Sequence, residues 1–207
     1  MNIRSLKNSI YFRFTKYLCI SKIKGQKSKK QIFLTFDDGP DDVITDQVLD
    51  LLRLHNAKAT FFNIGKKNVQ HPTLLEKIIK EGHSIGSHTY NHLSGYATDF
   101  NTYINDVEKS LLTCNTDIFR PPYGFITFRQ FRYLRKKYRI YIWNKGSNDH
   151  CGTIDDLDMH IASICTNTKS GDIILFHDTK EHADLTLKIL PRYLEYLSNE
   201  GYEMKAL

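Results

Sequence analysis

The sequence has few cysteines, few prolines and no long apolar run. Its four cysteines are widely spaced and form no Cys-x-x-Cys pair, which argues against a structural zinc knuckle and predicts reduced thiols. No apolar stretch is long enough for the core of a signal peptide or for a helix that spans a bilayer. From these absences we expect a cytoplasmic protein.

Acidic residues are missing from the first 30 positions. Residues 1–30 hold nine Lys or Arg, which leaves 20 of the 29 basic residues against 23 acidic ones in residues 31–207. The net charge of +6 therefore belongs to a basic N-terminal arm, residues 1–30. The arm contains IYFRFTKYLCI, in which Arg13 and Lys16 interrupt aromatic and aliphatic residues. This pattern fits an amphipathic helix on an anionic inner membrane surface, or a basic segment that packs on a domain edge or stays mobile.

The remaining residues, 31–207, predict a single α/β domain. Runs that indicate strands recur at 32–36, 60–64, 84–86, 140–143 and 173–176, with weaker ones at 118–119 and 202–206. Segments of helical periodicity lie between them, at 45–55, 72–81, 98–114 and 183–199. This alternation predicts a parallel sheet. Seven strands in a domain of this size favour a distorted (β/α)7-type barrel, although the spacing does not exclude an open sheet.

The segment FRQFRYLRKKYR, residues 128–139, carries six basic residues. Its apolar residues recur close to one helical face, which favours a helix with a basic, solvated outer face. No known nucleic-acid-binding motif accompanies it, and residues 31–207 are slightly acidic. We therefore expect no nucleic-acid partner.

Residues that carry chemistry follow the predicted strands, where functional loops of parallel α/β folds lie. The first such stretch, LTFDDGPDD, places Asp37 and Asp38 directly after the strand at 32–36. Two adjacent buried carboxylates repel each other. Either a positive group lies beside them, or the pair belongs to a solvated turn.

A second stretch, GSHTYNH, follows the strand at 84–86 and contains His88 and His92. On a helical turn, imidazoles four residues apart point the same way. With a carboxylate from another strand they would form a three-ligand, zinc-type site with an open position. A pair of histidines alone is weak support, and most of the chain's other histidines are expected at the surface or in packing.

Three further loops carry the remaining candidates. FRPPYG supplies Arg120 and Tyr123, whose main-chain N–H is free to point at a ligand; WNKGSNDH contains Trp143 and Asp149; and LFHDT places His177 at the end of the strand at 173–176. Five strand ends thus carry paired acids, paired imidazoles, an arginine, an aromatic with an acid, and another imidazole. This combination indicates one site rather than five solvated loops.

The segments TFDDGP, HTYNH, RPPYG and LFHD resemble, in content and order, the successive motifs of the polysaccharide deacetylases (the NodB homology domain, carbohydrate esterase family 4). The resemblance runs from about residue 31 to the C-terminus. It implies a distorted (β/α) barrel that uses a divalent metal, most often zinc, with cobalt, manganese or nickel as alternatives. The implied reaction removes acetyl groups from N-acetylated sugars of a polysaccharide or glycan precursor, by hydrolysis of a non-peptide carbon–nitrogen bond.

The resemblance also implies roles for individual residues. Asp38 would bind the metal together with His88 and His92. Asp37 would be the catalytic base, held ionised by Arg120, whose planar guanidinium can pair bidentately with a carboxylate.

The other implied roles concern the acetyl group and the leaving amine. The backbone N–H of Tyr123 would meet charge that develops on the carbonyl oxygen. His177 would donate a proton to the leaving amine. Trp143 and Leu175 would form the walls of the acetyl pocket.

The sequence departs from the family pattern in the fourth motif, which in many relatives reads D-x-x-D-W. Aligned on Trp143, Gly146 stands at the first aspartate, Asp149 at the second and His150 at the tryptophan. The first aspartate is the expected partner of the catalytic histidine. Either Asp149 replaces it, or His177 lacks a carboxylate partner and has a lower pKa.

Two other functions remain open. Gly146 favours a catalytically silent, metal-containing carbohydrate-binding domain, because loss of the acid's partner can silence a site without changing its shape. A related metal-dependent hydrolase of a small amide or cyclic imide would use the same chemistry. The deacetylase is favoured because a silent domain does not need Asp37, Arg120 and His177 together. A cytoplasmic location would suit a glycan precursor better than a finished extracellular polymer.

Overall fold

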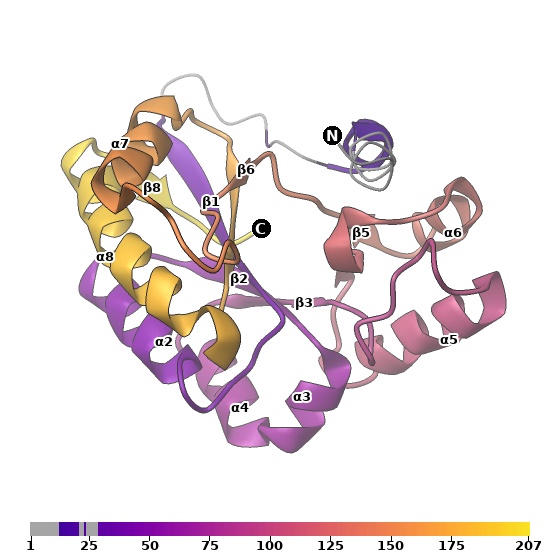
Figure 1. The fold of residues 1–207 in the computed structure, drawn as a ribbon. Coiled ribbons are helices and arrows are strands. Elements are labelled where there is room, and N and C mark those ends of the chain that lie inside the picture. The colour runs from indigo at the N-terminus through magenta and orange to yellow at the C-terminus, as the bar shows by residue number, and fades with distance from the viewer. Residues whose placement is uncertain (1–12, 21–22, 24–28) are drawn as a thin grey trace.

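The computed structural model describes residues 13–20, 23 and 29–207 of the chain (Figure 1). In this part of the chain all strand pairs are parallel, in the order β5-β4-β3-β2-β1-β7-β6, with β8 paired to the start of β1. The sheet curls into a half-barrel (Figure 1). Its strands are β1 (Gln31–Asp37), β2 (Ala59–Asn63), β3 (Ser84–Ser87), β4 (Ile118–Phe119), β5 (Arg139–Ile140), β6 (Lys145–Gly146), β7 (Ile173–His177) and β8 (Glu203–Met204).

Helices connect the strands and cover the outer face of the half-barrel (Figure 1). They are α2 (Thr45–Leu54), α3 (Gly65–Gln70), α4 (Pro72–Lys80), α5 (Phe100–Leu111), α6 (Phe128–Leu134), α7 (Leu157–Asn167) and α8 (Ala183–Asn199), with short 3₁₀ turns η1 (Pro122–Gly124) and η2 (Lys180–His182). The predicted single-domain, distorted (β/α)7-type barrel is therefore confirmed.

The predicted elements agree best with the structure where the sequence has a long amphipathic pattern. The predicted helix at 183–199 has the bounds of α8, whereas the basic helix predicted over 128–139 ends at Leu134. The sequence did not predict β6, α3 or α7. Helix α7 buries only Ile161 and Cys165. Its apolar face is therefore too narrow to produce a recognisable helical periodicity in the sequence.

Strand β1 lies in the interior of the sheet, between β2 and β7, and is apolar on both faces. All of its residues except the first are buried, as expected for a strand covered on both sides. It pairs with β2 on one side and β7 on the other, and the register sets Asp37 beside Phe62 and His177. This register brings the functional ends of three strands together.

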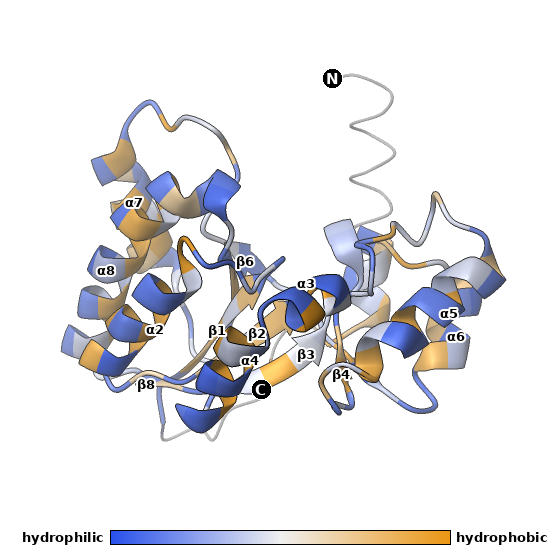
Figure 2. Ribbon diagram, turned by 90° about the horizontal axis from the view of Figure 1, so that it is seen from below, coloured by the Kyte–Doolittle hydropathy of each residue, from blue (hydrophilic) through white to orange (hydrophobic). Residues whose placement is uncertain are grey.

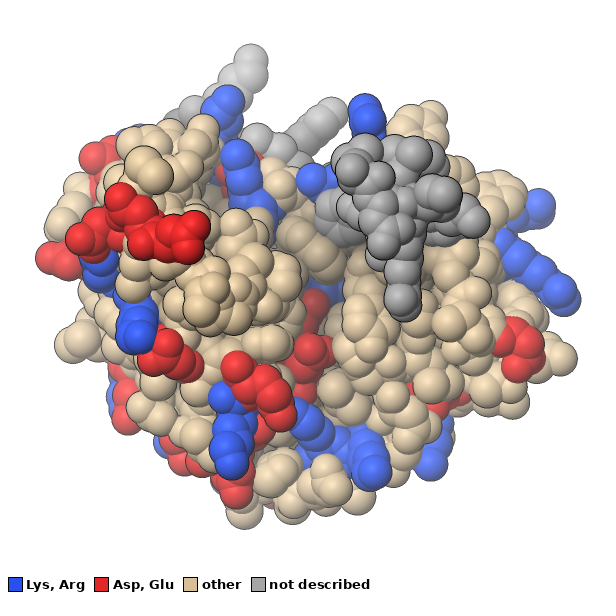
Figure 3. Space-filling model, in the orientation of Figure 1, with Lys and Arg blue, Asp and Glu red and all other residues tan. Residues whose placement is uncertain are grey.

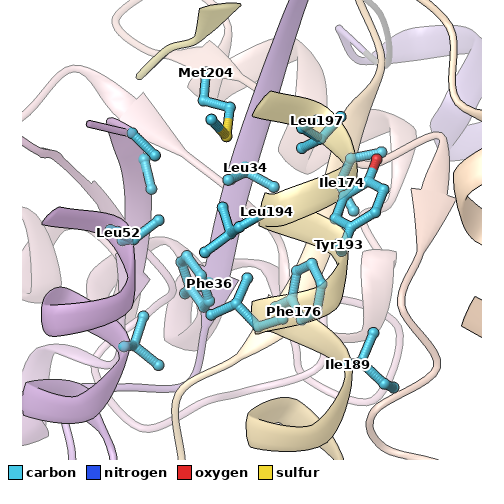
Figure 4. Packing of buried hydrophobic residues seen from close by; sticks show 14 of the residues in the cluster. Leu34, Phe36, Leu52, Ile174, Phe176, Ile189, Tyr193, Leu194, Leu197 and Met204 are labelled. Atoms are coloured by element: carbon cyan, nitrogen blue, oxygen red, sulfur yellow. The ribbon is translucent and has the colours of Figure 1, made fainter. Parts of the chain in front are cut away.

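The largest core cluster lies between the central strands and the helices α2 and α8. Figure 4 shows Leu34 and Phe36 of β1 packed with Leu194 of α8, and Phe36 stacks on Phe61 at a centroid distance of 5.0 Å. The helices turn apolar residues toward the sheet and polar residues outward (Figure 2). This packing fixes the strand ends that carry the site.

The described residues of the basic arm contact the sheet. Ile20 forms a parallel bridge with Tyr141, and its N–H donates to the carbonyl of Ile140 at 2.9 Å. The N–H of Ile23 donates to the carbonyl of Gly171, just before β7, at 2.9 Å. The arm thus links the β5 side of the sheet to the β7 side. These contacts agree with a segment that packs on the domain, while residues 1–12 lie outside the described part.

Basic side chains gather over α6 at the right-hand edge of the molecule (Figure 3). Arg129, Arg132 and Arg135 are exposed, as expected for a helix with a solvated basic face. None of the helices in the described residues is long and apolar enough to cross a membrane.

Candidate active site

The residues that the sequence singles out meet in a pocket of about 380 Å³ at the C-terminal ends of the strands. The pocket is lined by Asp37, Asp38, His88, His92, Tyr123, Phe125, Trp143, His150, Leu175, His177 and His182. The two other predicted site residues, Arg120 and Asp149, are buried and hydrogen-bond to Asp37 and His177. A larger hollow of about 840 Å³ between α2 and α8 contains none of these groups.

The two adjacent acids have different positive or polar neighbours. Asp37 is 3% exposed, and its Oδ1 accepts a hydrogen bond of 2.6 Å from Nη1 of Arg120, a residue that is fully buried. This ion pair removes the cost of burying either charge alone. The neighbouring Asp38 turns away through a left-handed backbone conformation, with φ of 72°, and faces the imidazoles.

The expected bidentate contact between Arg120 and Asp37 is not observed. Nη1 of Arg120 is shared between Asp37 and the hydroxyl of Thr35, 2.8 Å away. The guanidinium carbon lies 4.0 Å from the ring centroid of Phe62, so the ring fixes the plane of the group. Nε and Nη2 of Arg120 have no hydrogen-bond partner in the described part of the chain.

Asp38, His88 and His92 form one cluster of metal donors. Oδ1 of Asp38 lies 3.0 Å from Nε2 of His92 and 3.4 Å from Nε2 of His88. One ligand atom from each of the three residues lies within 4.8 Å of the others. The predicted convergence of these side chains is thus present in the structure.

The histidine pair converges through an irregular loop rather than the expected helical turn. Residues 88–92 form no helix, and both Thr89 and His92 have positive φ, 62° and 58°. The buried carboxylate of Asp106 on α5 holds this loop, because its Oδ2 accepts a hydrogen bond of 2.9 Å from the N–H of Tyr90. The four-residue spacing of the histidines correctly indicated that they converge. They converge because Asp106 holds the loop, and not because the loop forms a helical turn.

The donor cluster fits a divalent cation. Oδ1 of Asp38 is buried and faces both imidazoles without accepting a hydrogen bond from the described residues, so it is available to a cation. Nδ1 of His88 donates to the carbonyl of Arg120 at 2.9 Å, which leaves the lone pair on Nε2 free for a metal. Burial lowers the pKa of His88 to about 4, so the ring is neutral. One carboxylate with two imidazoles is a donor set of the zinc type.

The pKa of Asp38 responds to the same neighbours. Burial opposes its ionisation, but the imidazoles of His92 and His88 outweigh burial and lower the pKa below the usual range for aspartate. Asp38 is therefore ionised at neutral pH, as a metal ligand must be.

His177 has a carboxylate partner, and that partner is Asp149. Nδ1 of His177 donates to Oδ1 of Asp149 at 2.9 Å, and the His177 N–H donates to Oδ2 at 2.6 Å. The hydroxyl of Thr186 also donates to Oδ2, at 2.9 Å. Burial disfavours the charged ring, but Asp149 outweighs it and raises the pKa of His177 to about 9. The alternative of an unpartnered His177 with a lower pKa is wrong.

Gly146 does not disturb this arrangement. It lies on β6, paired in register with Leu175, and lines a separate hollow beside α7 rather than the active-site pocket. Position 146 is thus outside the pocket, although His150, the other departure in this motif, lines it. The main sequence argument for a silent domain rested on Gly146 and is therefore removed.

Aromatic and aliphatic side chains form the rest of the pocket wall. Tyr123 has φ of 60°, and its ring centroid lies 4.7 Å from that of His92. Its backbone N–H makes no hydrogen bond with the described residues. Trp143, partly buried, and Leu175, buried, line the same pocket, together with Phe125, which the sequence did not single out.

Four other residues at the site were missed or given no role. Thr35 and Thr186 supply buried hydroxyls to Arg120 and Asp149, and nothing in a sequence distinguishes such threonines from ordinary strand and helix residues. His150 and His182 line the pocket. Their nearness in sequence to Asp149 and His177 was the available signal, and His182 is an exception to the expectation of surface histidines.

The Asp149 contact predicts a large shift in a measurable titration. In the metal-free protein, His177 should titrate near pH 9 by NMR, because its protonated form keeps the bond to the carboxylate until the pH passes that value. Asp149→Asn removes the strongest favourable charge but leaves the burial and the weaker effects of Asp37 and Asp38, so the pKa should fall from about 9 toward the ordinary value of 6.5. Thr186→Val, which keeps the carboxylate, is the control and should shift it far less. An unchanged pKa in Asp149→Asn would show that another group stabilises the protonated form of His177.

Known proteins resemble this chain over most of its length. A model of the polysaccharide deacetylase family matches residues 24–141. A peptidoglycan-N-acetylglucosamine deacetylase of Bacillus cereus is 36% identical over 183 residues, which cover 84% of this chain and 85% of the relative. The peptidoglycan-N-acetylglucosamine deacetylase PgdA of Listeria monocytogenes is 30% identical over 190 residues, 89% of this chain but only 39% of that longer protein.

The fold comparison agrees with the sequence comparisons. A crystal structure of a peptidoglycan N-acetylglucosamine deacetylase superposes with a TM-score of 0.84 at 30% identity, covering 94% of this chain and 92% of the other. The family model spans more than half of the 207 residues and includes three of the four motifs, residues 35–40, 88–92 and 120–124. The match starts at residue 24, so the predicted domain boundary at 30/31 stays a prediction. The chain belongs to the polysaccharide deacetylase family.

Proposed function

We propose that the chain is a metal-dependent hydrolase that removes acetyl groups from N-acetylated sugars, with N-acetylglucosamine units of peptidoglycan or its precursors as the substrate class. One observation carries the proposal: a buried acid, Asp37, is bonded to Arg120, lies beside a donor cluster for a metal and is in register with His177 on the neighbouring strand. The names of the relatives support the choice of sugar. The chain spans only part of some relatives, so the substrate is part of the proposal.

Asp38, His88 and His92 would hold the metal, most often zinc in proteins with this donor set. When bound, the metal would polarise the acetyl carbonyl and lower the pKa of a water toward roughly 7. Asp37 would remain outside the ligand set. Its Oδ2 is 3.7 Å from Nε2 of His88, while Oδ1 is occupied by Arg120.

In the reaction, Asp37 would accept the proton of the attacking water. Arg120 fixes the orientation of the Asp37 carboxylate through the bond to Oδ1 and leaves Oδ2 to act as the base. The free N–H of Tyr123 would donate to the carbonyl oxygen as negative charge develops there, a contribution of about 3–4 kcal/mol in comparable sites.

His177 would then donate a proton to the departing amine, which leaves poorly as an anion. The bond from its Nδ1 to Asp149 keeps the ring charged and leaves the other nitrogen for the substrate. Trp143 and Leu175 would enclose the acetyl methyl group, since both line the pocket beside these groups.

The two alternatives are weaker. A silent carbohydrate-binding domain has no need for the Asp149–His177 pair, which raises the pKa of a pocket histidine to about 9. A hydrolase of a small amide or cyclic imide would use the same groups, and only the substrate distinguishes it.

The test is acetate release by purified protein loaded with zinc, measured on N-acetylglucosamine oligomers, lipid-linked precursors and peptidoglycan. We expect release from at least one of these glycans and none after chelation of the metal. A small acyclic amide and a cyclic imide serve as comparison substrates. Turnover of these alone would replace the proposal with the amide hydrolase, and metal binding without any turnover would support the silent domain.

The location of the protein and its contact with a membrane remain proposals. The arm carries nine basic residues without an acid, and its described part exposes Phe14 and Tyr17. Both features suit an anionic inner membrane surface. Sedimentation with vesicles that contain anionic lipid would test this contact, and equal binding to neutral vesicles would argue against it.

A further inference from the structure

The pocket contains a second cluster of metal donors, formed by Asp149, His150 and His177. One ligand atom from each residue lies within 4.8 Å of the others, as in the cluster around Asp38. The chemical composition is also the same, one carboxylate and two imidazoles. The deacetylase mechanism uses His177 with Asp149 but gives no role to His150.

The spacing of the donor atoms suits a small transition-metal ion. Oδ1 of Asp149 is 2.9 Å from Nδ1 of His177 and 3.8 Å from Nδ1 of His150. Zinc bound at about 2.0–2.1 Å to such atoms in a tetrahedral arrangement holds them about 3.3 Å apart, which lies between the two observed distances. Small rotations of the imidazoles would therefore complete the site.

The cluster is both anchored and accessible. The side chain of Asp149 is fully buried, and its Oδ2 is held by the hydroxyl of Thr186 and the N–H of His177, while Oδ1 faces the imidazoles. The side chain of His150 is 50% exposed and lines the pocket mouth, so an ion can reach the donors from solvent. The ring of His182 lies 4.8 Å from that of His177 and provides a further imidazole.

We propose that Asp149, His150 and His177 form a second, weaker site for a divalent transition-metal ion such as Zn²⁺, and that an ion bound there inhibits the enzyme. The ion takes the place of the proton on Nδ1 of His177, and that proton passes to solvent. Asp149 exchanges its N–H partner for the metal. His177 then keeps only the proton on Nε2. The Nε2–H of a neutral, metal-bound imidazole is a much weaker acid than imidazolium, so His177 becomes a poor proton donor to the leaving amine.

A zinc titration of the full chain tests the site independently of the reaction. We expect calorimetry to show two zinc ions per wild-type chain, one tight and one weaker. His150→Ala should retain the tight ion and lose the weaker one. Because the side chain of His150 is half exposed, this substitution should disturb the fold little. His55→Ala removes a partly exposed histidine that does not line the pocket, so this control variant should keep both ions. A single ion in the wild type, or two in His150→Ala, would overturn the proposal.

The inhibitory effect rests on the proposed function and needs the acetate assay. Zinc added beyond the first equivalent should reduce wild-type turnover at least 10-fold, and His150→Ala should lose most of this reduction when each protein is compared with its own rate at one equivalent. Equal inhibition in both would refute the inhibitory role. If no substrate is turned over, the proposed function fails, yet the titration still decides whether the second site exists.

Discussion

Asp37→Asn should abolish turnover while the protein retains its metal. Asparagine keeps the shape of the side chain but cannot accept a proton from water, so kcat should fall by roughly 10²- to 10⁴-fold, the usual contribution of a general base. Because Asp38 rather than Asp37 faces both imidazoles of the donor cluster, the metal content after dialysis should stay near that of the wild type. The measurements are acetate release and elemental analysis of the same preparation.

Asp37→Asn removes both the base and the buried ion pair with Arg120, so a second variant is needed to separate the two effects. Arg120 is fully buried, and without the charge of Asp37 it loses its only anionic partner among the described residues. Thr35→Val removes the other acceptor of Nη1 but keeps the carboxylate, so it should cost stability and retain far more turnover than Asp37→Asn. Loss of metal from Asp37→Asn would show that the roles of the two adjacent acids are reversed.

His88→Ala should remove the tightly held metal and, with it, nearly all activity. His88 contributes one of three donors, and its Nε2 is aimed at Asp38 by the bond from Nδ1 to the carbonyl of Arg120. Metal retained after extensive dialysis should therefore fall well below one ion per chain, and zinc should no longer raise the melting temperature through this site.

A second buried histidine provides a matched control for His88→Ala. His83 is 7% exposed, burial lowers its pKa to about 4 as for His88, and its Nδ1 accepts a hydrogen bond of 3.1 Å from the N–H of Ala59. It does not line the pocket. His83→Ala should lower the free energy of unfolding by about 1–3 kcal/mol, the usual cost of an orphaned buried donor, without loss of metal. Equal metal content in both variants would remove His88 from the ligand set.

Much of the fold was predictable because its signals are local. The continuous apolar run of β1 and the amphipathic period of α8 are properties of single segments, and both elements appear where they were expected. The short strand β6 and the weakly amphipathic α7 have no such signal, since tertiary packing rather than sequence pattern stabilises them.

The site was predictable in membership but less so in geometry. Asp38 and the histidine pair converge as expected, yet they do so through a loop that Asp106 anchors rather than through a helical turn. The orientation of Arg120 toward Asp37 likewise depends on the ring of Phe62 on β2, which packs against the guanidinium. Phe62 is far from Arg120 in the sequence, so no local pattern predicts this contact.

By itself, the sequence determined which side chains follow the strands. The alternation of apolar runs and polar turns shows where each strand ends along the chain and where the next loop begins. Only the tertiary structure decided how these side chains pair. His177 has a carboxylate partner, Asp149, which lies 28 residues away in the sequence. The buried oxygens of Asp149 accept hydrogen bonds from both the backbone and the ring N–H of His177. Such a pairing depends on the register of β7 with its neighbours and on the packing of α8, and these are set by contacts between segments that no single stretch of sequence contains.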